Sequence, residues 1–313
     1  MSAARRVLLP VTIAGALATV PAPVAAQWST LPQGIGALTL AFQYYDDTGR
    51  RFTDATRASV GQTETVSILL EADYGITDRF AATFGIPFIF ARYRGDPPPP
   101  FLPYDYAAVD ECHCWHSTFQ DFNLAARYRF GDDPWAVTPH VAYIHPSHDY
   151  YYQGEAVVGF DRQEFGVGVS AAYRLAGVLP RATIQAGYTY AFVERFLGIP
   201  NDRSYGSVEM QYAVTRRITI RAGGFWQYTH GGLRLGSPSG DPFYPPGEID
   251  TPERLQEFHR LFRNNFWQAG GGLSYSVGSF DIFAAFTKYV WGTDTHDGQA
   301  YTLGATWYFG GAK

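Results

Sequence analysis

Apolar and polar residues alternate with a period of two in about twelve segments, and this pattern constrains the fold more than any other feature. In residues 65–74, for example, most even positions are apolar and most odd positions are polar. Successive side chains of a β-strand point to opposite faces, so each segment predicts a strand with one apolar and one polar face. The predicted strands fall near residues 35–45, 65–74, 79–92, 121–130, 136–145, 163–173, 181–193, 207–214, 217–228, 264–276, 280–291 and 301–309.

The connections between these predicted strands alternate in length. Connections after even-numbered strands are short, at residues 75–78, 131–135, 175–180, 215–216 and 277–279. Connections after odd-numbered strands are mostly long, at 46–61, 93–117, 146–162 and 229–262, with 194–202 and 292–298 more modest. Outer-membrane barrels have short periplasmic turns and longer external loops, whereas a soluble Greek-key sandwich has no reason to alternate in this way. The chain therefore predicts an all-β fold, a transmembrane antiparallel up-and-down β-barrel of about twelve strands with both termini in the periplasm.

Aromatic side chains gather beside the short connections. The residues concerned are Tyr74, Phe80, Tyr128, Phe130, Tyr173, Tyr212, Tyr275, Trp307 and Phe309. Aromatic rings favour the boundary between the bilayer core and water, so these residues predict a girdle at the periplasmic interface. The polar faces carry many charges, which a second packed sheet could not cover without a large desolvation cost. This observation favours a barrel over a sandwich.

The amino terminus has the features of a secretory signal. Arg5 and Arg6 precede an apolar stretch at residues 7–20, and Val24-Ala25-Ala26 offers small residues for cleavage. We expect a signal peptide at 1–26 and a barrel at 27–313; the alternative, a retained anchor, has too short an apolar run to span comfortably. The net charge of −5 and the absence of a basic stripe give no indication of a nucleic-acid partner.

Several segments resemble one family of outer-membrane proteins. YGITDRF at 74–80 followed by GIPF at 85–88, FQDFNL at 119–124 leading to RYRF at 127–130, and YTLGATWYF at 301–309 carry the resemblance. They are similar to the transporter family named after the MetA pathway of phenol degradation. Gln120 stands where that family usually has glycine, and Gly310 to Lys313 follow the aromatic Phe309 where such barrels typically end. The resemblance implies an outer-membrane barrel linked to uptake of small hydrophobic or aromatic compounds.

Charged residues on the polar faces are candidate lumen residues. They are Glu71, Asp121, Arg127, His140, Glu164, Glu209 and Arg221. A two-residue turn at Thr215-Arg216 would place Glu209 opposite Arg221. One interpretation is a charged constriction that selects which solutes pass. The other is a network of ion pairs that only fills the lumen.

Residues 112–116 have the sequence Cys-His-Cys-Trp-His, which is unusual for an external loop. Thiolates and imidazoles are ligands for Zn²⁺ or Cu⁺, so Cys112, His113, Cys114 and His116 form a candidate metal site. The spacing matches no standard structural zinc site. A disulfide between the two cysteines, or two free thiols beside solvated histidines, are the alternatives. No cofactor is expected.

The pattern gives little support to catalysis. His145, Ser147 and His148 lie together in a loop with only Asp149 as an orienting acid, and His140 belongs to a polar face with no serine placed to meet it. Loop 229–262 predicts a short helix, with Thr251 as its cap and an apolar side that includes Leu255, Phe258, Leu261 and Phe262. It either closes over the mouth as a gate or is a packed turn of an external loop.

We therefore expect a non-enzymatic channel or transporter for small solutes in the bacterial outer membrane. The alternative is a structural or surface-binding barrel with a closed lumen, whose external loops recognise a partner; a lipid-modifying enzyme is a third hypothesis. The expected partners are outer-membrane lipid, a small-molecule solute and the barrel-assembly machinery that would insert the chain.

Overall fold

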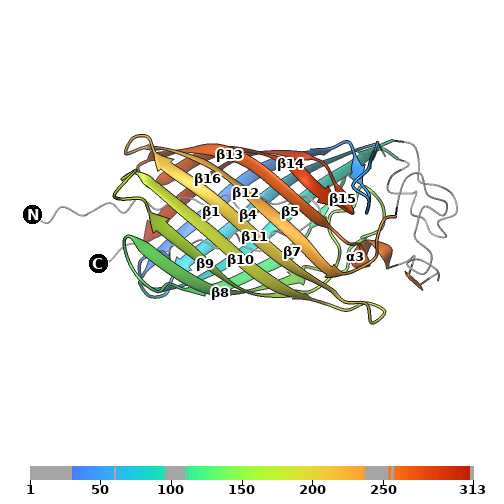
Figure 1. Ribbon diagram of the computed structural model, residues 1–313, viewed down its shortest axis with the longest axis horizontal. Helices are drawn as coiled ribbons and strands as arrows, with labels where there is room; N and C mark the ends of the chain where they lie inside the picture. The colour runs from blue at the N-terminus through green and yellow to red at the C-terminus, as the bar shows by residue number, and fades with distance from the viewer. Residues whose placement is uncertain are drawn as a thin grey trace, which may run out of the picture.

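Antiparallel strands in the described residues form one continuous hydrogen-bonded sheet that closes into a barrel (Figure 1). The computed structural model describes residues 30–59, 61–95, 110, 112–236, 253–254 and 257–310, so the expected signal peptide at 1–26 lies outside them. The spanning strands are β1 (Ile35–Asp47), β4 (Gln62–Gly75), β5 (Phe80–Arg94), β6 (His116–Phe119) with β7 (Asp121–Tyr128), β8 (Trp135–Pro146), β9 (Glu164–Arg174), β10 (Ala182–Val193), β11 (Asn201–Ala213), β12 (Ile218–Gly231), β13 (Asn265–Val277), β14 (Phe280–Thr293) and β16 (Gln299–Gly310).

The ladder has no open edge within this sheet. Each spanning strand pairs with the next along the chain, β4 pairs with β5, and β1 pairs with β16 to join the two ends of the barrel. Both β6 and β7 pair with β5 and are separated only by Gln120, so they form two parts of one strand and the described barrel has twelve strands. Closure pairs the backbone N–H and C=O groups that an open edge would leave unsatisfied in lipid. The predicted fold class is confirmed.

The two faces of each strand have opposite exposure. Leu303 is 58% exposed on the outer face of β16, while its neighbour Thr302 is 7% exposed and faces the lumen. On β4, Leu70 is 43% exposed and Ser67 is 1% exposed. The apolar side chains therefore cover the outside and the polar ones fill the interior, as the period of two predicts.

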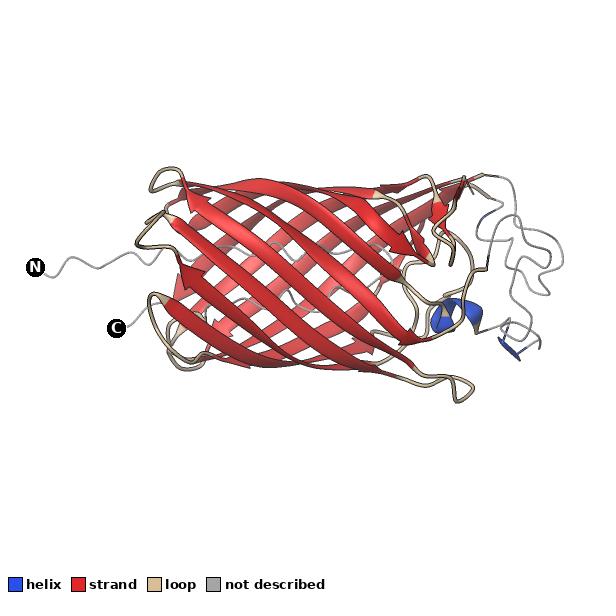
Figure 2. Cartoon of the chain, in the orientation of Figure 1, coloured by secondary structure: helices blue, strands red, loops and turns tan. Residues whose placement is uncertain are grey.

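The two ends of the barrel differ, as Figure 2 shows. The start of β1, the end of β16 and the short turns lie at one end, the short-turn end, and the described parts of the longer connections lie at the other, the long-loop end. Small elements at the long-loop end are β2 (Arg50–Arg51), β3 (Arg57–Ala58), β15 (Thr295–His296) and α3 (Phe258–Leu261). No helix in the described part of the chain is long and apolar enough to cross a membrane.

Most of the predicted girdle residues are exposed on the outer face, including Tyr74, Tyr128, Tyr173 and Trp307. A second set of outward rings lies nearer the long-loop end. Tyr188, Trp226 and Trp267 follow one another at centroid distances of 6.1 and 6.3 Å.

Gly206 lies under this second set. A Cβ at Gly206 would lie 2.1 Å from the Trp226 ring, so only glycine lets the indole cross β11. The barrel therefore has aromatic side chains near both ends of its apolar surface.

A β-bulge near the end of β14 places two adjacent apolar residues on the outer face. The register shifts between Trp267 and Gln268, which pair with Trp291 and Tyr289, so Val290 is the extra residue. Val290 and Trp291 are 61% and 56% exposed and both face outward. Below the bulge, the ordinary alternation of β14 resumes.

Placing a charge on the outer face tests the assignment of the lipid-facing surface. We expect Leu303→Arg to lower the free energy of unfolding by about 2–4 kcal/mol, because a mid-strand arginine would enter the hydrocarbon core. Ser279→Arg, in an exposed short turn, is the matched control and should change little. Urea unfolding in lipid vesicles measures both; equal losses for the two variants would contradict the assignment.

Candidate functional site

The seven candidate lumen residues do not form a single ring. Asp121 and Glu164 begin β7 and β9 at the long-loop end, whereas Glu71, Arg127, Glu209 and Arg221 lie within a few residues of the short turns. His140 is near the middle of β8, where it exchanges a 2.9 Å hydrogen bond with the Thr189 hydroxyl. The structure therefore separates a long-loop group from a short-turn group.

The long-loop group is saturated by partners. Glu164 accepts hydrogen bonds from Arg162 and Arg203 at 3.3 Å and from the Tyr205 hydroxyl at 2.9 Å. The Tyr150 hydroxyl donates to Asp121 at 2.5 Å. Arg162 and Tyr150 belong to loop 147–163, so these bonds fix that loop inside the mouth of the barrel.

The short-turn group contains one closed ion pair. Arg127 pairs with Asp73 and donates to the Thr83 hydroxyl at 2.6 Å, and Thr83 donates to Asp73 at 2.8 Å. Both charged side chains are almost fully buried. Glu71 faces the same part of the lumen, two residues before Asp73 on β4, and it is more exposed than Asp73. Arg127 is thus a structural residue rather than an open selector.

The predicted pairing of Glu209 with Arg221 is wrong. Arg221 pairs with Gln211, and Glu209 pairs with Gly223. The hairpin closes at Ala213 and Thr219 because the turn is longer than Thr215-Arg216. The Thr215 hydroxyl accepts hydrogen bonds from the backbone N–H groups of Arg217 and Ile218, and this capping fixes the longer turn.

Aromatic residues of the lumen wall form a cluster that the sequence analysis did not identify. Tyr45, Tyr205 and Phe266 are buried together, with Phe225 and Tyr289 packed against them. These residues come from five different strands, β1, β11, β12, β13 and β14. Tyr205 and Phe266 lie 6.1 and 5.9 Å from the Phe225 ring, measured between centroids. The cluster therefore packs on the lumen side toward the long-loop end, where the Tyr205 hydroxyl bonds to Glu164.

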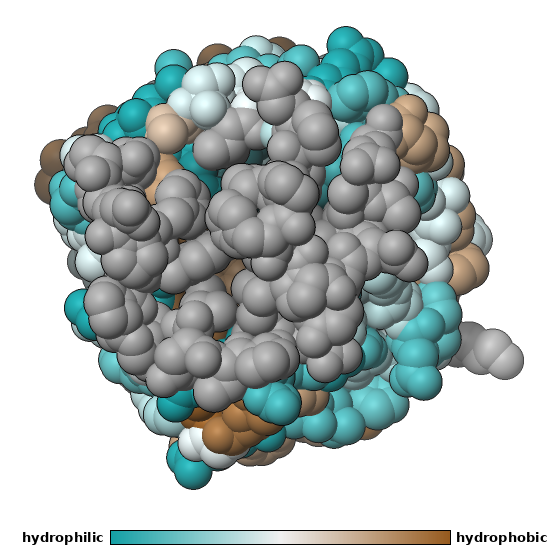
Figure 3. All heavy atoms as spheres, turned by 90° about the vertical axis from the view of Figure 1, so that its right-hand side faces the viewer, coloured by the Kyte–Doolittle hydropathy of each residue, from teal (hydrophilic) through white to brown (hydrophobic). Residues whose placement is uncertain are grey.

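Loop residues cover part of the mouth by apolar packing. Phe258, Leu261 and Phe262, from α3 and the residue after it, pack with Phe52, Leu233 and Leu235. Glu257 is the N-cap of α3 and makes no side-chain capping hydrogen bond. The predicted cap, Thr251, lies outside the described residues, as does Leu255 of the predicted apolar side. Figure 3 looks onto this end, where most described residues of the rim are hydrophilic, with apolar patches among them. The described part of the predicted helix is therefore packed at the mouth.

Ion pairs also hold the mouth. Arg50 donates two hydrogen bonds to Glu155 at 2.5 and 2.6 Å, and Arg260 pairs with Asp161. A cavity of about 30 Å³ beside Arg50, Glu155 and the buried His259 has room for about two water molecules. Burial lowers the pKa of His259 to about 4, so that this side chain is neutral at ordinary pH.

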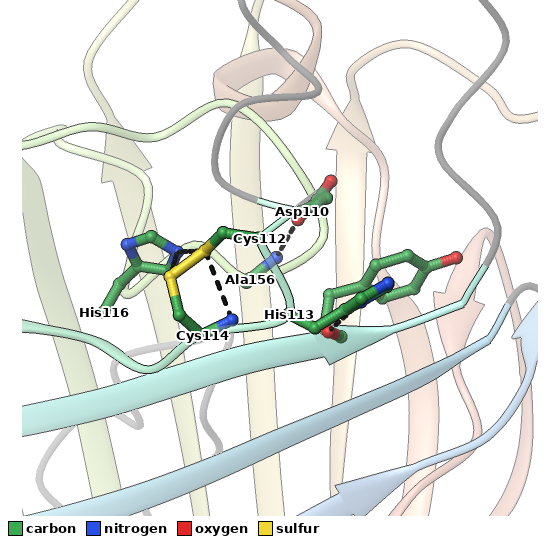
Figure 4. The surroundings of a disulfide bond; sticks show 7 residues. Asp110, Cys112, His113, Cys114, His116 and Ala156 are labelled. Carbon is green, nitrogen blue, oxygen red and sulfur yellow. Dashed lines mark hydrogen bonds between the residues drawn. A yellow bond between two sulfur atoms is a disulfide. The ribbon is translucent and has the colours of Figure 1, made fainter.

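Asp110 anchors loop 147–163 from the neighbouring connection. Its carboxyl oxygens accept hydrogen bonds from the backbone N–H groups of Glu155 and Ala156 at 3.0 Å each, and Figure 4 shows the bond from Ala156. Burial raises the pKa of the Asp110 carboxyl to about 7, and the Glu155 charge adds to this effect, while the two N–H donors oppose it.

The candidate metal site is oxidised. Cys112 and Cys114 form a disulfide, and the His116 Nε2 lies 3.5 and 3.7 Å from their sulfurs. His113 points away and its Nδ1 lies 3.1 Å from the Tyr93 carbonyl oxygen (Figure 4). Metal coordination requires thiolates, so the three clustered groups Cys112, Cys114 and His116 could bind an ion only in a reduced loop. Of the alternatives above, the structure has the disulfide.

The histidines near Ser147 lack the geometry of a catalytic triad. The Ser147 hydroxyl lies 2.8 Å from His148 Nδ1, and the Nε2 atom of that histidine lies 2.9 Å from the Thr118 hydroxyl. A hydroxyl therefore occupies the position where a triad has an orienting carboxylate.

Comparisons with known proteins give a fold but no family. No family model matches the sequence, and no curated protein matches it. The crystal structure of an outer membrane channel from Pseudomonas putida F1 is similar at a TM-score of 0.68 and 12% identity, covering 91% of this chain and 98% of that one. The chain has an outer-membrane barrel fold.

Two other solved structures have lower scores. The NanC porin has a TM-score of 0.47 and 9% identity over 86% of this chain and 98% of that one. A mutant of the TodX monoaromatic hydrocarbon channel has a TM-score of 0.44 and 9% identity, covering 89% of this chain and 91% of that one. The resemblance to the phenol-degradation family stays a prediction.

Asp73→Asn tests whether the Arg127 pair is structural. We expect a loss of about 3–5 kcal/mol of unfolding free energy, because the variant leaves a buried guanidinium without its carboxylate. Adding Arg127→Gln should restore most of that loss. Asp132→Asn, which removes the exposed partner of Arg79 in a turn, is the control and should change little. Urea unfolding of the four proteins would contradict the pairing if the double variant were no more stable than Asp73→Asn.

Asp110 makes the anchoring of loop 147–163 depend on pH. A carboxyl whose pKa is raised on folding stabilises the docked loop below its unfolded pKa, and this contribution is lost as the pH rises through about 7. We expect backbone amides of that loop to lose hydrogen-exchange protection between pH 5.5 and 8, after correction for intrinsic exchange. Asp110→Asn should remove the pH dependence. If Asp110→Asn keeps the same pH dependence, that dependence arises from another titrating group.

Proposed function

We propose that this protein is a channel of the bacterial outer membrane through which small solutes pass, with hydrophobic and aromatic compounds favoured. The observation that carries the proposal is the aromatic cluster of Tyr205, Phe225 and Phe266 on the lumen wall of a barrel with an apolar exterior. The sequence resemblance to an uptake family and the fold of the Pseudomonas putida channel support it.

The route to the membrane is part of the same proposal. Residues 1–26 would direct export and be removed, and the barrel-assembly machinery would insert the remaining chain. The proposed activity is passive or facilitated passage, with no catalytic step.

A closed barrel is the second candidate, and one observation favours it. Loop 147–163 and α3 are held at the mouth by the Arg50–Glu155 and Arg260–Asp161 pairs and by a buried apolar cluster. Under this proposal the long loops would recognise a partner and the lumen would not conduct.

Reconstitution separates the two candidates. We expect liposomes containing the protein to take up benzyl alcohol faster than empty liposomes, and planar bilayers to show discrete conductance steps. Phe258→Ala should raise the conductance because it loosens the packing at the mouth, whereas Phe280→Ala, on the outer face at the short-turn end, should not. A folded protein without conductance or uptake in both the wild type and Phe258→Ala would favour the closed barrel.

A further inference from the structure

Arg221 differs from the other lumen-facing arginines of the spanning strands. Arg127 is bonded to Asp73 and Thr83, and Arg203 is bonded to Glu164. Arg221 is 7% exposed, yet its Nε, Nη1 and Nη2 atoms are all buried without a hydrogen-bond partner. A guanidinium has five N–H donors and no acceptor, so it requires acceptor oxygens in this position.

The nearby acids are engaged elsewhere. Glu209 and Asp281 are the carboxylates whose charges act on Arg221. However, Glu209 accepts hydrogen bonds from Gln185 at 2.8 Å and Gln211 at 2.5 Å, and Asp281 accepts one from Tyr308 at 3.2 Å. These bonds hold both carboxylates in place, so they offset the positive charge from a distance while the three guanidinium nitrogens keep no hydrogen-bond partner.

On the β13 side, the wall beside Arg221 lacks side chains. Its cross-strand partner on β13 is Gly272, and the next lumen-facing position on β12 is Gly223, which pairs with Gly270. An added Cβ at Gly223 would lie 2.3 Å from the Val208 carbonyl oxygen, so the backbone itself requires glycine there. The following lumen-facing residue is Phe225, which belongs to the aromatic cluster. The three glycines thus lead along the wall from the Arg221 guanidinium to the half-buried Phe225 ring.

We propose that Arg221 binds the carboxylate of a small aromatic acid whose ring lies over the glycine stretch toward Phe225. A planar guanidinium matches a carboxylate with two parallel hydrogen bonds, which gives orientation as well as affinity. A neutral solute satisfies fewer donors, and a cation satisfies none. Glu209 and Asp281 weaken the attraction for the anion, which allows release, and passage requires that binding be reversible. This inference rests on the proposed channel and names its substrate class.

The test measures binding separately from passage. Benzoate is the probe, with acetate as the aliphatic acid and benzyl alcohol as the neutral aromatic. Equilibrium binding to purified protein in detergent micelles gives affinity, and uptake into liposomes gives passage. Arg221→Gln and Arg221→Lys are the variants, and Ser274→Ala, a buried residue on the lumen face of β13, is the matched control.

We expect Arg221→Gln to weaken benzoate binding about tenfold or more, because a charge-assisted bidentate contact is lost. Arg221→Lys, which keeps the charge without the fork, should be intermediate, and benzyl alcohol uptake should stay unchanged in every variant. Heat-modifiable migration on gels checks that each variant is folded.

Equal benzoate affinity in folded Arg221→Gln and the wild type would overturn the inference. If Arg221→Gln does not fold, the wild type and Arg221→Lys are compared instead. The inference is then overturned if the wild type binds benzoate no more tightly than benzyl alcohol. Loss of benzoate binding in the variant supports the site even if no solute enters liposomes. The absence of solute entry into liposomes would contradict the proposed channel but not the binding site.

Discussion

The closed ladder of backbone hydrogen bonds is the constraint on which the rest of this structure depends. In a bilayer no water is available to satisfy a free N–H or C=O group, so the sheet must end on itself, as β1 does on β16. Because side chains alternate strictly along each strand, closure gives them two environments, the lipid outside the barrel and the lumen inside it. Every residue that is not compatible with lipid must face the interior, whatever its charge, and the protein must provide partners for it there.

These partners are provided differently at the two ends. At the long-loop end, Asp121 and Glu164 bind residues of loop 147–163, so the charges are used for docking a loop. At the short-turn end no long loop is available, and side chains of the wall must serve one another. Arg127 and Asp73 do so completely, whereas Arg221 has acids nearby but no contact. Arg221, whose three guanidinium nitrogens all lack a partner among the described residues, thus lies at the end where the chain has no long loop to supply one.

Most of the fold could be predicted from the sequence because strand alternation is a local property. All twelve predicted segments are strands, and the short and long connections lie at opposite ends. Register could not be predicted equally well. One side-chain cap at Thr215 lengthened a turn and moved Arg221 from Glu209 to Gln211, and the bulge at Val290 changed the face of one strand end. Each depends on a single bond or residue that period-two patterns do not contain.

The site was harder to predict because it is assembled from distant parts of the chain. Tyr45 and Tyr205 share one cluster although 160 positions separate them, and closure of the barrel brings β1 and β11 to face each other across the lumen. The sequence identified charged residues because each belongs to a polar face, but it could not distinguish a saturated arginine from an open one. That difference depends on which side chains the neighbouring strands place opposite each arginine. In the proposed channel, selectivity would depend on register, because a shift of two residues in one hairpin changes which side chain lies opposite Arg221.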